Sequence, residues 1–120
     1  MRLEPGTEVV RDRLKSGQCV MHAVNVAEFC FTISRKLPEA YTPDTAMAWI
    51  ATAEIGVAEN LDPDFLRLTA HIRLASRESR ALSVGDGIAV ALAASLGVPL
   101  LTTERAFNHA ADFARIELIR

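Results

Sequence analysis

The sequence predicts a single α/β domain, residues 1–120, built around a small, mostly parallel sheet. Segments with helical and strand-like patterns alternate along the chain, which is typical of this fold class. The run at 98–102 is almost continuously apolar, as in parallel strands that are covered on both faces. The run at 84–96 is apolar on nearly every side, which indicates a central helix. Half of the 120 residues are hydrophobic and 23% are charged, so the chain can bury a core.

Capping and turn residues divide the first half of the chain into five elements. Helices are predicted at 7–17, 25–37 and 42–56, and short strands at 19–24 and 57–61. Gly17 ends the first helix. Asn25 is the expected cap of the second helix, which stops before Pro38. Thr42-Pro43 places a capping threonine before a proline at the first position of the third helix, and Gly56 ends that helix.

The second half of the chain is divided by the same kinds of signal. Helices are predicted at 62–77, at 83–96 and from residue 103, and strands at 98–102 and 115–119. Asp62-Pro63 opens the first of these helices. Ser83 caps the apolar helix, and Gly97 with Pro99 separates it from the strand that follows.

Charge and cysteine content limit the class of protein. A net charge of −2 argues against a chain that coats nucleic acid by bulk electrostatics, but it leaves room for a local basic patch. Cys19 and Cys30 lack the spacing of a metal finger, so reduced core thiols and a cytoplasmic location are expected. No signal peptide is expected, because the first residues run directly into a charged helix. The longest uncharged run is interrupted by Gly97 and Pro99 and predicts no membrane span.

Three acidic residues are predicted at the starts of helices, each after a strand or a loop: Glu28, Asp86 and Glu104. In an open α/β sheet the carboxyl ends of the strands share one rim with the following helix starts, and ligands bind there. Carboxylates delivered to that rim from three segments would converge on a divalent cation. Each acid also has a simpler explanation. Asn25 and Ser83 each stand three residues ahead of an acid, as in a capping box, and the helix macrodipole stabilises any acid in a first turn.

Other polar residues carry weaker signals. Four arginines lie on or just after one predicted helix, where they indicate either a solvated face or a patch that positions phosphates: Arg67, Arg73, Arg77 and Arg80. The three histidines share no metal-ligand spacing and are expected to be structural.

Taken in order, several segments resemble the PIN-domain ribonucleases, most closely the VapC-type toxins of bacterial toxin–antitoxin pairs. The matching segments are Glu4-Pro5-Gly6, Ala23 to Glu28, Leu82 to Asp86, Ala91-Leu92-Ala93 and Leu96 to Phe107. The resemblance implies a PIN-like three-layer α/β/α sandwich with a small, mostly parallel sheet. It also implies a Mg²⁺ or Mn²⁺ site in which Glu28, Asp86 and Glu104 are the metal ligands and the catalytic residues.

The same resemblance implies a substrate and partners. Thr102 matches a polar residue at the end of a family strand, and Arg105 and Asn25 are further candidates for substrate binding. An enzyme of this type hydrolyses RNA phosphodiesters. A cognate antitoxin protein laid across the acidic pocket would restrain it, and a homodimer is expected.

One part of the family pattern is missing from the sequence. The family begins with a short hydrophobic strand that ends in a metal-binding Asp and lies mid-sheet, beside the strands matched here by 19–24 and 98–102. Glu4-Pro5-Gly6 matches the stretch after that strand and its helix, so an amino-terminally truncated domain is expected. Three acids would still bind Mg²⁺ weakly, but hydrolysis would suffer far more than binding. The unpaired strand edges would need a partner, such as another copy of the chain.

The leading prediction is therefore a metal-dependent endoribonuclease impaired by the missing first Asp. The main alternative is a catalytically inactive PIN domain that serves as a dimerising or antitoxin-binding module. A start inside a longer, active protein is a third reading, and an unrelated α/β protein that binds a small apolar ligand is a fourth.

Overall fold

The computed structural model describes residues 19–77, 82–102 and 113–118 of the chain. The elements are β1 (Val20–His22), α2 (Ala23–Lys36), α3 (Pro43–Thr52), β2 (Gly56–Ala58), α4 (Pro63–Ser76), α5 (Val84–Leu96), β3 (Leu100–Thr102) and β4 (Ile116–Leu118). The fold is α/β, as the sequence predicts. The helices predicted at 7–17 and from Thr103 lie outside the described residues.

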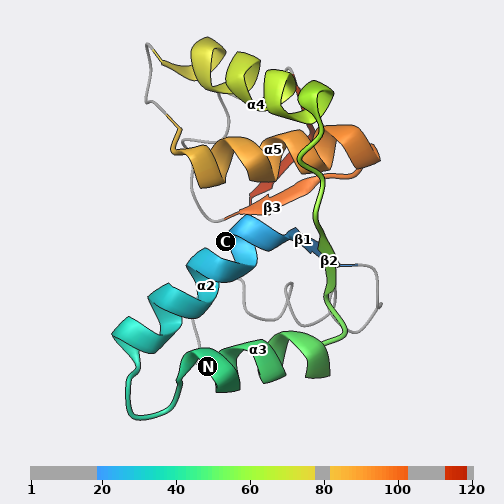
Figure 1. Ribbon diagram of the computed structural model, residues 1–120. Coiled ribbons are helices and arrows are strands. Elements are labelled where there is room, and N and C mark those ends of the chain that lie inside the picture. Colours follow the sequence, from blue (N-terminus) through green and yellow to red (C-terminus); the bar gives the residue numbers. More distant parts are fainter. Residues whose placement is uncertain (1–18, 78–81, 103–112, 119–120) are drawn as a thin grey trace.

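The strands lie between two layers of helices (Figure 1). On one side α4 packs on α5, and on the other α3 packs on α2. The first side holds an apolar cluster around Phe65 and Ile72, and the second holds a cluster around Val26 and Ile50. The described helices therefore cover both faces of the strands, as a three-layer sandwich requires.

The strands form two parallel pairs. β1 pairs with β2, placing Met21 opposite Val57, and β3 pairs with β4, placing Leu101 opposite Glu117. No hydrogen bond of the described strands joins one pair to the other. The sequence predicts one small sheet, and the described strands instead make two sheets of two strands each.

The start of α2 differs from the sequence prediction. Asn25 is not the cap. The helix begins at Ala23 because His22 occupies the cap position, where its ring accepts a hydrogen bond from the backbone N–H of Val24. The preceding strand is correspondingly shorter than 19–24. Glu28 therefore lies in the second turn of α2, not in the first.

The end of α3 also comes earlier than predicted. The helix stops at Thr52, and Glu54 has a left-handed φ of 57°. This turn brings Ile55 back against the apolar cluster that contains Ile50, and the N–H of Ile55 donates to the carbonyl of Ile50 at 3.2 Å. The packing of Ile55, which a local pattern does not show, ends the helix before Gly56 does.

The bounds of α5 follow from local signals at both ends. The Ser83 hydroxyl accepts a hydrogen bond from the N–H of Asp86, and Gly97 closes the helix with a left-handed φ of 65°. Nothing lies within 4 Å of the position that a Cβ on Gly97 would occupy, so only the backbone conformation favours glycine there.

We expect Gly97→Ala to lower the free energy of unfolding by about 1 kcal/mol, because an L-residue is strained in the left-handed region. Gly97→Asn should cost less, because asparagine tolerates that region better. Urea unfolding of the two variants checks both values. Equal stability of Gly97→Ala and the parent would show that the turn relaxes without strain.

The cysteines and the helix lengths can be compared with the expectations about thiols and membrane spans. Cys19 and Cys30 are both free thiols, and Cys30 is buried. The longest described helices have 14 residues, whereas a bilayer needs about 20 apolar ones. Within the described ranges, no helix combines the length and the apolar character needed to cross a membrane.

Candidate functional site

The site begins at the junction of β1 and α2, which His22 holds in place. The His22 ring is fully buried and stacks on Phe65, with ring centroids 5.3 Å apart. Its Nδ1 accepts from the N–H of Val24 at 3.1 Å, so the proton of the neutral ring sits on Nε2, which donates to the carbonyl of Asn60 at 2.8 Å. His22 therefore has a structural role, which is to fix where α2 starts.

Asn25 joins the first turns of α2 and α5. Its amide Nδ2 donates to the carbonyl oxygen of Gly85 at 2.8 Å, across 60 positions of sequence. This hydrogen bond brings the amino-terminal half of α2 against the start of the central helix. Asn25 thereby fixes the first turn of α2 relative to the first turn of α5.

Glu28 lies one turn after Asn25 and places its carboxylate against Gly85. A Cβ atom on Gly85 would lie 1.7 Å from Oε1 of Glu28 and 2.6 Å from its Cδ. The carboxylate thus occupies space that any other residue type at position 85 would fill. Since Asp86 is the next residue along α5, the structure brings two of the three predicted acids into one neighbourhood.

Asp86 faces the strands. It lies on the same side of α5 as Val90 and Ala93, four and seven residues further along the helix. Ala93 lines a hollow against the start of β3 and β4, so this is the strand side of the helix. The side chain of Asp86 is half-buried, and its backbone N–H, not its carboxylate, makes the capping bond to Ser83.

The direction of β3 places its carboxyl end at the same rim. After Gly97 the chain turns back, with the N–H of Val98 bonded to the carbonyl of Ala93, and β3 then runs toward the start of α5. Thr102 ends β3 on that side. The carboxyl ends of β1 and β3 and the start of α5 therefore define one rim, where open α/β sheets bind ligands.

Arg73 approaches α5 from the other side. Its Cγ lies 2.8 Å from the position of a Cβ on Gly87, and its Nε donates to the carbonyl of Leu82 at 3.0 Å. Arg67 is paired with Asp64, and Arg77 donates to the carbonyl of Leu74 at 2.6 Å. Arg80 lies outside the described residues. Arg73 is the arginine that the described structure fixes beside the turn that carries Asp86.

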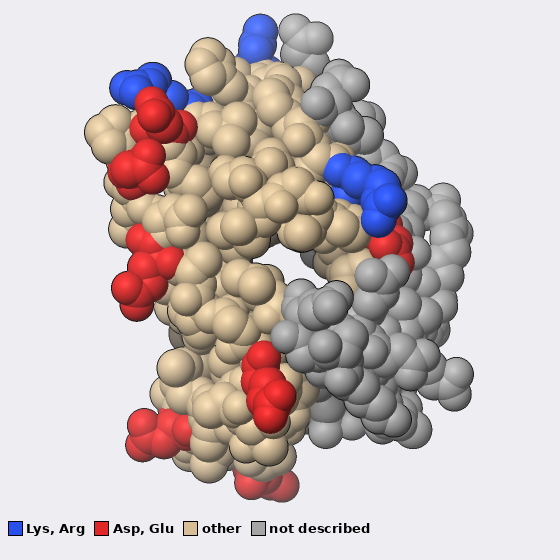
Figure 2. All heavy atoms as spheres, turned by 90° about the vertical axis from the view of Figure 1, so that its right-hand side faces the viewer, with Lys and Arg blue, Asp and Glu red and all other residues tan. Residues whose placement is uncertain are grey.

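The charged side chains are unevenly distributed over the surface. On the face shown in Figure 2, Lys and Arg of the described residues lie in the upper half, at the height of α4 and α5. In the lower half, at the height of α3, the coloured side chains of the described residues are acids. On this face, the basic side chains of the described residues therefore lie nearer to α4 and α5 than to α3.

The remaining predicted site residues are only partly covered by the structure. Glu104 and Arg105 lie outside the described residues, and Thr102 is placed by its backbone. Among the described residues, no group of three His, Cys, Asp or Glu side chains is close enough to hold a metal ion. Mg²⁺ is commonly held by one or two carboxylates, with water and substrate phosphate completing its shell. Glu28 and Asp86 fit that donor set.

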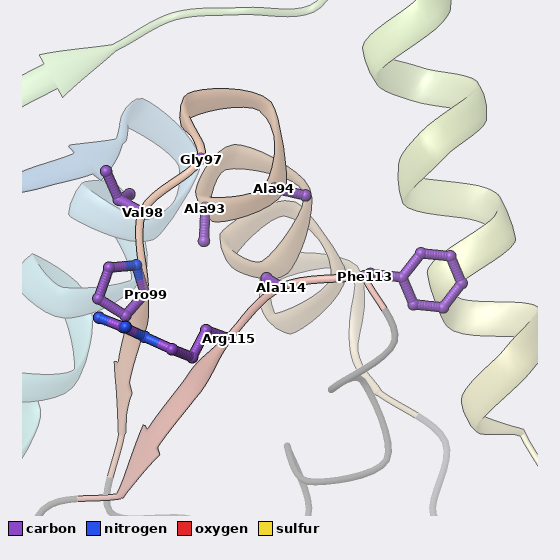
Figure 3. Close-up of a pocket in the computed structure, with 8 residues that line it drawn as sticks. All are labelled: Ala93, Ala94, Gly97, Val98, Pro99, Phe113, Ala114 and Arg115. Atoms are coloured by element: carbon purple, nitrogen blue, oxygen red, sulfur yellow. The ribbon is translucent and has the colours of Figure 1, made fainter.

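A separate hollow lies at the opposite end of α5, where β3 and β4 begin. Figure 3 shows Arg115 beside Pro99 at its mouth, while Phe113 points away toward α4. Phe113 packs on the apolar cluster of α4 and α5. The residues that line this hollow include no acid, so it is not the place where the predicted ligands meet.

The amino-acid pattern was not used to predict a close contact at Gly85, although two glycines near the start of one helix do indicate such a contact. Glycine inside a helix costs about 1 kcal/mol relative to alanine, and α5 has two glycines in its first four residues, Gly85 and Gly87. Such a pair indicates close approach by neighbouring side chains. The structure identifies these neighbours as Glu28 on one side and Arg73 on the other.

Comparison with known proteins bears on the family and the fold. A family model described as PIN domain matches residues 1–113. Comparison with curated proteins gives no match, and neither does comparison with solved structures.

Proposed function

Because the chain belongs to the PIN-domain family, whose members are generally divalent-metal nucleases, we propose that it is an endoribonuclease of the VapC toxin type. The observation that carries the proposal is the contact of the Glu28 carboxylate with Gly85, directly beside Asp86, at the rim where β1 and β3 end. Two carboxylates brought to one rim from α2 and α5 suit a site for a hard cation and an RNA phosphate.

Glu28 and Asp86 would hold Mg²⁺ or Mn²⁺, together with Glu104. When bound, the cation supplies charge that offsets a developing negative phosphate and acidifies a bound water. Ser83 fixes the start of α5, and Asn25 fixes α2 against it, so both acids are positioned by hydrogen bonds to backbone groups. We therefore assign Asn25 a positioning role.

Substrate contacts would come from residues around the same rim. Arg73 is held next to the turn that carries Asp86, and it suits a contact to an RNA phosphate. Thr102 ends β3 at the rim, and Arg105 follows it in sequence by three residues.

A protein partner is part of the proposal. Leu66 and Leu74 stand two turns apart on α4 and are 49% and 55% exposed. A repeated apolar position on an exposed helix face suits a second protein surface, so we propose that α4 contributes to a homodimer. A cognate antitoxin would restrain the enzyme by covering the acids.

Replacing the second acid tests the proposal. We expect Asp86→Asn to reduce Mg²⁺- or Mn²⁺-dependent cleavage of a mixed pool of structured RNAs by at least about 100-fold, because the amide removes the charge that holds the cation. The thermal midpoint should stay unchanged, since the capping bond uses the backbone N–H of Asp86. Asp64→Asn, an exposed acid on α4 paired with Arg67, is the matched control and should cleave like the parent.

Binding of Mn²⁺, followed by electron paramagnetic resonance, completes the experiment. The parent should bind Mn²⁺ and Asp86→Asn should bind it at least tenfold more weakly. Cleavage that is equally fast in parent and Asp86→Asn would overturn the proposal. So would a parent that neither cleaves RNA nor binds Mn²⁺.

A further inference from the structure

One face of α2 carries a line of three exposed side chains: Glu28, Phe31 and Arg35. Phe31 and Arg35 follow Glu28 by three and seven residues, so the three share one side of the helix. The opposite side is buried in the cluster that contains Val26 and Cys30. α2 starts beside α5 and then leads away from it (Figure 1), so the line begins at the rim where Glu28 lies and continues outward.

The packing of the fold does not account for Phe31. Its side chain is 66% exposed, and it belongs to neither apolar cluster of the described residues. Phe29, two positions earlier, packs on the α2–α3 cluster, and its ring centroid lies 5.6 Å from that of Trp49. The core therefore uses one phenylalanine of α2 and leaves the other in solvent. A single exposed apolar side chain is ordinary on a protein surface, so its role has to be judged from its neighbours.

Arg35 lies over the ring of Phe31. Its guanidinium carbon is 5.6 Å from the ring centroid, which is within the range of a cation–π interaction. None of the described acids forms an ion pair with Arg35, although Glu39 stands four residues further along the chain. The guanidinium therefore covers one face of the ring and keeps N–H donors for a further group. With 66% of its side chain exposed, Phe31 keeps the other ring face open.

An open aromatic face beside an arginine suits a nucleotide. Bases of single-stranded RNA stack on aromatic rings, and a guanidinium can donate to a phosphate of the same strand. A second protein fits this face less well, because the exposed neighbours of Phe31 on α2 are Ala27 and charged residues, which make no continuous apolar patch. Lys36 stands next to Arg35 in the last turn of α2, and two cations there attract a polyanion.

We propose that Phe31 and Arg35 form a base-stacking subsite for single-stranded RNA. One base stacks on the open face of Phe31, and Arg35 donates to a phosphate oxygen of the same strand. Phe31 follows Glu28 by about 4.5 Å along the helix axis, so one strand can occupy the subsite and the rim at once. The choice of RNA rests on the proposed function. The subsite adds to it a preference for single strands, since the bases of a duplex are not free to stack on a side chain.

The test measures binding without cleavage. Two fluorescein-labelled probes of twelve nucleotides are compared by fluorescence anisotropy in EDTA. One is an oligoadenosine, and the other has the same ribose phosphates but no bases. EDTA removes divalent cations, so neither a metal site nor hydrolysis contributes to the result. The variants are Phe31→Leu, Phe31→Trp, Arg35→Gln and Lys36→Gln.

We expect the parent to bind oligoadenosine about tenfold more tightly than the abasic probe, because of the base stacked on Phe31. Phe31→Leu keeps an apolar side chain but has no ring, so it should lose this preference and bind the abasic probe as the parent does. Phe31→Trp should keep the preference. Since the side chain is exposed, urea unfolding of both variants should match that of the parent.

The two cations are expected to differ. Arg35→Gln should weaken the binding of both probes and lower the slope of log affinity against log salt by about one, as loss of one phosphate contact does. Lys36→Gln is the matched control, because it removes the same charge from the next residue, which is turned by about 100° around the helix axis. It should change the salt slope less and keep the preference for oligoadenosine.

Several outcomes would overturn the subsite. Equal affinity of Phe31→Leu and the parent for oligoadenosine would show that no base stacks on the ring, and so would an equal loss for both probes. A parent that binds neither probe would also contradict it. If Phe31→Leu changed the oligomeric state in sedimentation velocity and left RNA affinity unchanged, the occupant of this face would be a protein. The proposed function fails separately, through the cleavage and Mn²⁺ binding of Asp86→Asn, because the anisotropy measurement needs neither metal nor hydrolysis.

Discussion

Gly85→Ala is expected to reduce RNA cleavage about 100-fold, because a misplacement of about 1 Å in a catalytic group can cost that much. The new methyl carbon would fall 1.7 Å from Oε1 of Glu28, so the carboxylate must move by more than an ångström. Glu28 is exposed and can swing outward, so the side chain moves and the backbone stays. Cleavage and Mn²⁺ affinity should therefore fall together while the fold is kept.

A stability measurement distinguishes displacement of the Glu28 carboxylate from loss of the fold. Alanine is the better helix former by about 1 kcal/mol, so Gly85→Ala should unfold at the same urea concentration as the parent or at a higher one. Gly87→Ala is the matched control, since it lies two residues along the same helix and its methyl carbon meets Arg73 Cγ at 2.8 Å instead of an acid. Gly87→Ala should retain Mn²⁺ affinity.

A double-mutant cycle identifies the carboxylate responsible. Glu28→Ala and Gly85→Ala act on one group, so the double variant should lose no more activity than Glu28→Ala alone. Additive losses would mean that Gly85 acts through something other than Glu28. Full activity of Gly85→Ala would show that the position of Glu28 in the structure is not needed for the chemistry.

His22→Leu is expected to lower the free energy of unfolding by about 2 kcal/mol, since it removes a helix cap and the hydrogen bond to the carbonyl of Asn60. The ring caps α2 at Val24, donates to Asn60 and stacks on Phe65, all from a fully buried position. Leucine keeps the apolar contact with Phe65 and loses both hydrogen bonds. Urea unfolding measures the change.

Two further variants show how much of the stability loss comes from the hydrogen bonds of His22. His22→Asn keeps a side chain that caps helices well, so it should recover roughly half of the loss. His71→Leu, on the exposed face of α4, should change stability by less than about 0.5 kcal/mol. If His22→Leu were as stable as the parent, the cap and the bond to Asn60 would contribute nothing.

The sequence alone predicts α5 and the start of α3 correctly. Ser83 and Gly97 bound α5 at the predicted residues, and Thr42-Pro43 begins α3 with a capping box. These features need only hydrogen bonds and backbone angles among residues a few positions apart. The asparagine at 25 carries the same local signal, but the buried ring of His22 takes the cap position. The ring of His22 is held in that position by its hydrogen bond to Asn60, 38 positions away.

For the predicted acids, too, some features follow from nearby residues and others only from contacts between distant segments. Their residue types and their places after strands come from the sequence, and so does the resemblance to PIN domains that the family match supports. That Glu28 lies against Gly85 depends on how α2 packs on α5, across 60 positions.

The sequence by itself therefore determined the alternation of elements, the bounds of the central helix and the identity of the acids, because short-range hydrogen bonds and backbone preferences act within a few residues. Only the tertiary structure decided which carboxylate meets Gly85, where α2 begins, and that the described strands make two parallel pairs. Strand pairing and side-chain contacts between distant segments depend on packing of the whole chain, and no local pattern contains that information.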